Sequence, residues 1–305
     1  MMPAVQVALD QWLLRLHNAP RGRSYSGTFV VTTSEFMSSS RIWHVCNGQQ
    51  QLERVESLTG EPRSIFRRDD QVITLFPASR LAVRERRESL GLFPDLLRRA
   101  EGALAAHYRL EVLGVGRVAG LPTEVVQLVP SDALRFGYRI WTERSTGLVV
   151  KLQTLDAGQQ VLEQAAFSEL QLAAPVTLQR LSAQMDQLQG YQVRSDTAAR
   201  TTAEQHGWRQ TAQVAGFTPV RCHQRGDDAT GLLRLQCAYS DGLATVSLFV
   251  EPFDARSHTQ VPGQSRVLGA TQVLTRRYEQ WWLTAVGEVP RQTLALFLQG
   301  LERQK

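Results

Sequence analysis

The side chains that most often carry catalysis or bind metals are scattered along this chain. No two histidines have the spacing of a zinc site, and no Ser or Cys stands in a nucleophile-elbow motif. Dinucleotide-binding, Walker and H-E-x-x-H patterns are also missing. We therefore expect neither enzymatic activity nor a cofactor. The six histidines are His17, His44, His107, His206, His223 and His258.

The three cysteines could form a disulfide, remain free thiols or help to bind a metal ion. Cys222 and Cys237 flank a predicted hairpin, and a disulfide between them would stabilise it by roughly 3 kcal/mol and suit an oxidising compartment. Two buried free thiols are the alternative. A zinc site using His223 as well is disfavoured, because adjacent strand residues point to opposite faces. Cys46 is either a buried small hydrophobe or an exposed thiol that cross-links two chains; we expect burial.

Arginine dominates the basic residues. Of 34 Lys and Arg residues only Lys151 and Lys305 are lysines, which leaves 34 − 2 = 32 arginines. Because guanidinium groups hold phosphates and carboxylates bidentately, this bias suits an anionic partner, although codon usage alone would also produce it. A solvated face is the alternative to an anion site. The candidate anion-binding residues are Arg84, Arg86, Arg87, Arg98 and Arg99.

Length and composition limit the kinds of protein that this chain can be. With 305 residues, 43% hydrophobic and 21% charged, the chain is typical of two ordinary globular domains. No apolar run approaches the ~20 residues of a membrane helix. The start, Met1-Met2-Pro3-Ala4, shows no signal peptide. Duplex nucleic acid is not expected as a partner, since neither a recognition helix nor a basic patch interleaved with aromatics is present.

The first half of the chain predicts a long antiparallel sheet with two helices. Apolar spacing indicates an amphipathic helix over residues 4–18 and a second over Leu92–Ala105. About eleven strands surround the second helix, each bounded by turn residues. In one of them Phe136, Tyr138 and Ile140 should face the core, while Arg135 and Arg139 should face outward.

A sheet of this length must cover its concave face with only two short helices. A half-open barrel wrapped over the helices satisfies this requirement and leaves an apolar cavity, which predicts an amphiphile-binding site. A solidly filled core is the alternative. The predicted cavity residues are Trp12, Leu13, Leu16, Phe29, Val31, Leu92, Phe93, Leu96 and Leu97.

The second half predicts a smaller module. We expect a first domain over residues 1–180, a linker over 181–206 that is rich in small and polar residues, and a small α+β domain over 207–305. Its final helix begins at Pro290. Trp281 and Trp282 are neighbours in one strand, so one should be core and the other covered by the first domain or by a partner. The fold class is thus α+β, a half-open barrel followed by a smaller domain.

Several short motifs, in this order and spacing, resemble the RseB/MucB family of periplasmic regulators of the envelope-stress sigma factor. The resemblance runs from about Tyr25 to about Leu301. The motifs are Leu92-Phe93-Pro94-Asp95-Leu96-Leu97, Val115–Pro122, Arg135–Lys151, Tyr239–Pro252 and Val286–Pro290.

The resemblance implies a periplasmic, non-catalytic negative regulator. Its first domain would resemble the LolA/LolB lipoprotein carriers. Its partner would be the periplasmic segment of a transmembrane anti-sigma factor of the RseA/MucA kind, which it would protect from proteolysis until lipopolysaccharide or a mislocalised lipoprotein releases it. A lipid or lipoprotein carrier is the alternative function, and an envelope lipid hydrolase is a weaker one. The oligomeric state stays open, with a homo-oligomer among the alternatives.

Overall fold

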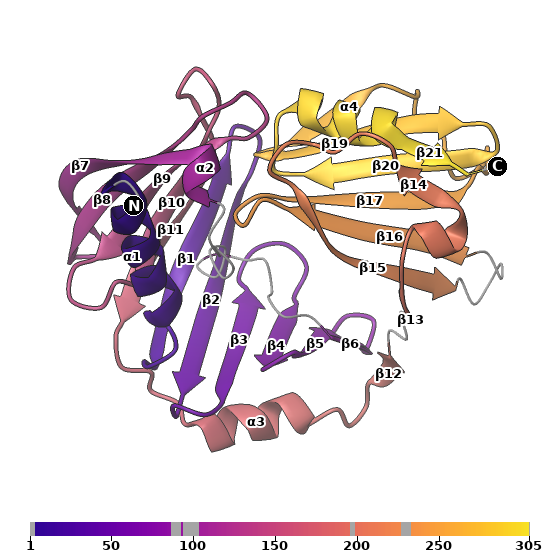
Figure 1. Ribbon diagram of the computed structural model, residues 1–305. Coiled ribbons are helices and arrows are strands. Elements are labelled where there is room, and N and C mark those ends of the chain that lie inside the picture. Colours follow the sequence, from indigo (N-terminus) through magenta and orange to yellow (C-terminus); the bar gives the residue numbers. More distant parts are fainter. Residues whose placement is uncertain (1–3, 87–92, 94–103, 196–198, 227–232, 305) are drawn as a thin grey trace.

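The computed structural model describes residues 4–86, 93, 104–195, 199–226 and 233–304 (Figure 1). Most of the secondary structure is β, arranged in two large sheets and one small two-stranded sheet. Few helices accompany them. In the described part of the chain, no helix combines the length and apolar character needed to cross a membrane.

The first sheet has twelve strands in the order β12-β6-β5-β4-β3-β2-β1-β11-β10-β9-β8-β7. Its two edges, β12 and β7, are not paired with each other, so the described strands form an open sheet, not a closed barrel. The strands are β1 (Tyr25–Thr33), β2 (Met37–Cys46), β3 (Gln51–Ser57), β4 (Ser64–Arg68), β5 (Gln71–Phe76), β6 (Leu81–Arg86), β7 (Tyr108–Val118), β8 (Leu121–Pro130), β9 (Gly137–Glu143), β10 (Val149–Leu155), β11 (Val161–Gln171) and β12 (Gln192–Ser195).

One face of this sheet packs against helix α1 (Ala4–Asn18) and the short helix α2 (Leu104–His107). Figure 1 shows α1 lying in front of the sheet, near the β7 side. Leu13 and Leu16 of α1 are buried there. The predicted second helix falls almost entirely on residues 87–92 and 94–103, which lie outside the described part.

The other face is covered by helix α3 (Leu178–Asp186). Ile42 belongs to the cluster under α1, whereas Val45 belongs to the cluster under α3. These positions are three apart on one strand, so their side chains point to opposite faces. Leu181 and Met185 of α3 are fully buried against this second face.

The segment 181–206, predicted to be a linker, contains regular structure. The end of α3 lies in it, β12 adds a parallel strand to β6, and β13 (Ala199–Thr201) pairs with β15. The 3-10 helix Glu204–His206 follows. Composition did not predict the strands β12 and β13, because both are short and carry few large apolar side chains.

The second sheet has seven strands in the order β13-β15-β16-β17-β20-β19-β18, and α4 (Arg291–Gly300) packs on it through Leu294, Phe297 and Leu298. The predicted hairpin of this module is formed by β15 and β16. The bounds are β15 (Thr218–Gly226), β16 (Leu233–Ser240), β17 (Thr245–Pro252), β18 (Ser265–Leu268), β19 (Thr271–Tyr278) and β20 (Trp281–Gly287), with β14 (Trp208–Gln210) and β21 (Leu301–Arg303) forming the small sheet.

Candidate functional site

An apolar cluster lies between α1 and the first sheet. Three of its aromatic rings are phenylalanines that pack together: Phe93 has its ring centroid 5.6 Å from that of Phe29 and 5.2 Å from that of Phe167. Phe29 and Phe167 are cross-strand neighbours on β1 and β11. Leu13 and Leu16 belong to the same buried cluster.

The structure brings together most of the residues predicted to line a cavity. Trp12 and Val31 are partly buried against the cluster. Leu92, Leu96 and Leu97 lie outside the described residues. The role of this cluster as a ligand cavity stays a prediction.

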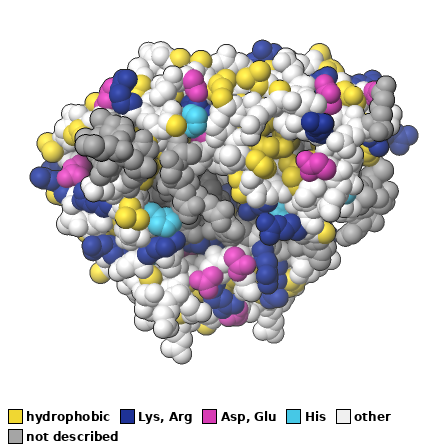
Figure 2. All heavy atoms as spheres, viewed as in Figure 1, with side chains coloured by type: hydrophobic (Ala, Val, Ile, Leu, Met, Phe, Trp, Pro, Cys, Tyr) yellow, Lys and Arg dark blue, Asp and Glu magenta, His cyan; other side chains and the backbone are white. Residues whose placement is uncertain are grey.

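The predicted anion site is only partly within the described chain. Arg84 and Arg86 are exposed on β6, and the Arg86 Nη1 atom lies 3.9 Å from Asp70 Oδ2. Arg87, Arg98 and Arg99 lie outside the described residues. On the face in Figure 2, Lys and Arg side chains are dispersed among Asp and Glu side chains and do not gather into one patch.

A buried polar contact joins the two modules. Arg135 donates from Nε to Asp241 Oδ2 at 2.9 Å, and the Tyr108 hydroxyl donates to the same oxygen at 3.1 Å. Arg135 also donates from Nη2 to the Ala215 carbonyl at 2.8 Å. Gly216, with φ +81°, lies so close that an added Cβ would be 2.5 Å from this Nη2 atom.

The expectation that Arg135 faces solvent is therefore wrong. Its side chain is fully buried because Asp241 and the Ala215 carbonyl of the second module, together with Asp132 of the first, satisfy the guanidinium. Phe136, Tyr138 and Ile140 are buried, as predicted. Burial raises the pKa of Tyr108 and of Tyr138 well above the ordinary value, which keeps both phenols protonated.

A second contact between the modules brings two carboxyl groups toward each other. The Glu163 Oε2 atom accepts from the Ala270 backbone N–H at 3.4 Å. Burial, and then repulsion from Glu163, raise the pKa of Glu288 to about 7. Burial also raises the pKa of Glu163.

Both tryptophans proposed for partner binding are packed inside the second module. Trp282 is buried, and His258 stacks on it with ring centroids 4.9 Å apart. Trp281 is partly buried, meets Trp208 edge to face at 5.7 Å, and carries the Arg303 guanidinium 4.7 Å from its ring. A partner-binding role for either ring stays a prediction.

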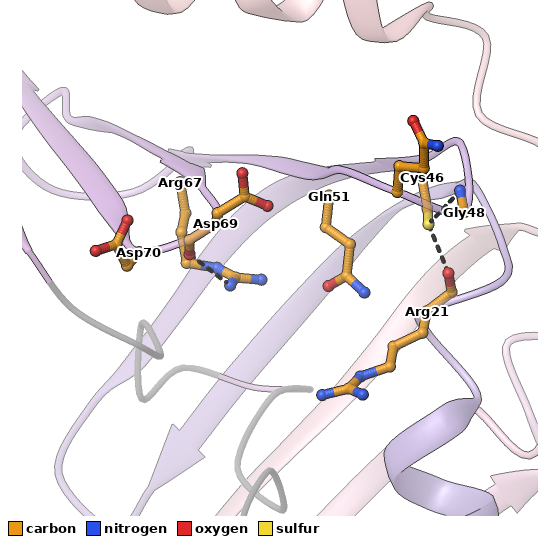
Figure 3. Close-up of a pocket in the computed structure, with 8 residues that line it drawn as sticks. Arg21, Cys46, Gly48, Gln51, Arg67, Asp69 and Asp70 are labelled. Atoms are coloured by element: carbon orange, nitrogen blue, oxygen red, sulfur yellow. Dashed lines mark hydrogen bonds between the residues drawn. The ribbon is translucent and has the colours of Figure 1, made fainter.

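Cys222 and Cys237 are directly opposite on β15 and β16 and form a disulfide. Cys46 is a free, half-buried thiol. It lines a pocket of about 420 Å³ together with Arg21, Arg67 and Asp69 (Figure 3). Its sulfur contacts the Arg21 carbonyl and accepts from the Gly48 backbone N–H at 3.3 Å. Within the described residues, no three His, Cys, Asp or Glu side chains are grouped closely enough to hold a metal ion.

Comparison with known proteins covers both modules. The MucB/RseB N-terminal domain matches residues 8–185, and the MucB/RseB C-terminal domain matches residues 202–302. The chain belongs to the MucB/RseB family.

Within this family, the sigma factor AlgU regulatory protein MucB of Pseudomonas aeruginosa is 33% identical over 95% of this chain and 89% of its own length. The sigma-E factor regulatory protein RseB of Haemophilus influenzae is 23% identical over 98% of this chain and 92% of its own. A crystal structure of MucB in complex with MucA(peri) aligns with a TM-score of 0.73 and 29% identity, covering 97% of this chain and 99% of that one.

Sequence reasoning missed two buried ionic groups of this MucB/RseB chain. One is the Arg135–Asp241 pair; the other consists of His44, Glu53 and Arg67 on neighbouring strands. The second had a weak signal, since His44, like Glu53, stands where strand alternation predicts an inward side chain. For Arg135, no sequence signal could have shown that its partner Asp241 lies 106 positions away in the second module.

Proposed function

We propose that this chain is a non-catalytic regulator that binds the periplasmic segment of a transmembrane anti-sigma factor and shields it from regulated proteolysis. The observation that carries the proposal is the similarity, across both modules, to MucB in its complex with MucA(peri). Relatives from two genera bear sigma-factor regulatory names. Similarity over nearly the whole chain supports the function of the complete regulator, not that of one module alone.

The proposed compartment is the periplasm. The Cys222–Cys237 disulfide supports it, because disulfides persist in oxidising compartments. The label MucA(peri) in the related complex points the same way.

We also propose that an amphiphile, either lipopolysaccharide or an acylated lipoprotein, weakens this binding. The first sheet and α1 would act as a LolA/LolB-like half-barrel, with acyl chains held among the aromatic cluster around Phe29, Phe93 and Phe167. Arg84 and Arg86 are the described candidates for an anionic headgroup. Such a ligand can act only if it binds the partner-free state more tightly than the complex.

The contact of Tyr108 with Asp241 is the route we propose for coupling the modules. The Tyr108 ring belongs to the apolar cluster of the first module, and its hydroxyl donates to a carboxylate of the second. That carboxylate also orders the turn before β17, since its Oδ1 atom accepts from the backbone N–H groups of Leu243 and Ala244 at 2.9 and 2.8 Å. A ligand that displaces the Tyr108 ring would therefore disturb the second module.

The test is a titration of the purified full chain with the periplasmic segment of the cognate anti-sigma factor, repeated with lipopolysaccharide or an acylated peptide. A scrambled segment and a non-acylated peptide are the controls. Saturable binding of the segment, weakened only by the amphiphile, is the expected result.

A lipid carrier is the second candidate function. This second candidate rests on one observation, which is that the apolar cluster under α1 is built almost wholly from the first module. An acyl ligand that binds while the segment shows no affinity would support the carrier and exclude the regulator.

A further inference from the structure

A ladder of buried polar residues crosses the first sheet. His44 on β2 lies directly opposite Glu53 on β3, and Glu53 lies directly opposite Arg67 on β4. The His44 Nδ1 atom is 2.8 Å from Glu53 Oε1, and Arg67 Nε is 2.8 Å from Glu53 Oε2. All three side chains are at most 4% exposed.

The other ring nitrogen of His44 reaches the chain just after α1. Its Nε2 atom is 2.8 Å from the carbonyl oxygen of Pro20, two residues beyond the end of the helix. The Tyr25 ring stacks on the imidazole with centroids 4.8 Å apart. His44 thus connects the end of α1 to the sheet that α1 covers.

The chemistry of the two acceptors defines the protonation of His44. A carboxylate and a backbone carbonyl can only accept, so both ring nitrogens must donate for both contacts to be hydrogen bonds. The imidazole is then a cation. Burial raises the pKa of Glu53, but hydrogen bonding and attraction to His44, then attraction to Arg67, outweigh it and hold that pKa far below its ordinary range.

The ladder borders a pocket whose lining is charged. Arg67 donates from Nη1 to the Asp69 carbonyl at 3.1 Å and lines the pocket in Figure 3. Arg21, Asp70 and Cys46 line the same pocket, so it carries charges of both signs. The last turn of α1 carries two further basic groups: His17, which makes contacts of its own, and Arg15, whose Nη1 atom is 3.0 Å from Glu124 Oε2.

We propose that His44 is a proton-dependent latch that holds the end of α1 against the first sheet. A neutral imidazole has one N–H, which the Glu53 carboxylate, as the stronger acceptor, retains. The bare Nε2 lone pair then faces the Pro20 carbonyl and the latch opens. The end of α1 is held at acidic pH and released as rising pH removes the His44 proton.

The latch has a consequence for the ligand site, and this consequence alone rests on the proposed function. Leu13 and Leu16 of α1 close one side of the apolar cluster. Tyr25 links His44 to the same cluster, because its ring meets Phe167 edge to face at 6.5 Å. Loosening α1 would open the region where an acyl chain is proposed to bind.

The test is imidazole ¹⁵N NMR on the full chain, with the His44 signals assigned by their loss in His44→Gln. We expect both His44 nitrogens to carry protons at pH 6 and one of them to lose its proton as the pH rises. Across the same pH range, hydrogen-exchange protection of the last two turns of α1, corrected for intrinsic exchange, should fall by about tenfold, as for one lost hydrogen bond to a charged donor.

Two variants separate the latch from a general loss of structure. In Glu53→Gln, a neutral imidazole can make both contacts, because Nδ1 accepts from the new amide while Nε2–H donates to Pro20. We expect α1 protection to become independent of pH in this variant. His206→Gln, in the second module, is the matched control and should keep the wild-type pH dependence. A neutral His44 at pH 6, or α1 protection in the wild type that does not change with pH, would overturn the proposal.

Discussion

Arg135 and Asp241 are 106 positions apart in the chain, yet they form an ion pair in which both side chains are fully buried. The guanidinium comes from the first module and the carboxylate from the second. Removing Asp241 would leave the buried Arg135 with the partly exposed Asp132 as its remaining carboxylate partner, which is costly. The pair therefore explains why the two modules associate in a specific way.

The first prediction concerns this pair. Asp241→Ala should lower the free energy of unfolding by about 3 kcal/mol, the low end of the cost of breaking a buried pair, because the buried Arg135 then keeps only its ion pair with Asp132. Urea denaturation measures the change. Glu111→Ala is the matched control: it removes the exposed Arg109–Glu111 pair and should cost at most about 1 kcal/mol. Equal effects of the two substitutions would contradict a structural role for the buried pair.

The second prediction addresses coupling between the modules. Tyr108→Phe keeps the ring in the apolar cluster and removes only the hydrogen bond to Asp241, so stability should fall by about 1 kcal/mol. The amphiphile should then weaken binding of the anti-sigma segment less than in the wild type. Titration of the segment with and without amphiphile gives both affinities. Tyr191→Phe, near α3, should behave as the wild type, and an unchanged amphiphile effect in Tyr108→Phe would remove this route.

The third prediction is a pH dependence at the Glu163–Glu288 contact. The folded-state pKa of Glu288, about 7, is above its ordinary value, so between roughly pH 4.5 and 7 the folded state binds more protons than the unfolded state. This carboxyl therefore lowers stability as the pH rises through that window. Glu288→Gln should raise the melting temperature at pH 8 and leave it nearly unchanged at pH 4.5.

Exposed Glu61 provides the comparison for Glu288. Glu61→Gln should change the melting temperature little at either pH. If Glu288→Gln instead stabilises the chain equally at both pH values, titration of Glu288 is not the cause.

The fourth prediction concerns the disulfide, which joins residues 15 positions apart. The double substitution Cys222→Ser with Cys237→Ser should cost about 3 kcal/mol in the chain-entropy account. A reducing agent should lower the melting temperature of the wild type and of Cys46→Ser, but not that of the double variant. If Cys46→Ser instead abolished the sensitivity to reductant, the effect would come from Cys46 and not from the disulfide.

Local patterns predicted the strands well. Phe136, Tyr138 and Ile140 alternate, and all are buried, because a strand that covers a core must turn every second side chain inward. The same rule placed Arg135 outward and was wrong, since the second module covers that side of the chain. Alternation says which side chains share a face but not what the face meets.

The sequence by itself determined that both modules are built on strands, and it determined the family, because these depend on short-range periodicity and on motifs in order. The predicted α+β class holds only in part, since the described chain is mostly β with few helices. Only the tertiary structure decided that Arg135 meets Asp241, that His44 joins Glu53 to the end of α1, and that α3 covers the second face of the first sheet. The Arg135–Asp241 pair and the packing of α3 join segments distant in sequence, whereas the His44 group joins consecutive strands to the chain after α1. Burial makes a charge depend on such partners, and no local pattern specifies them.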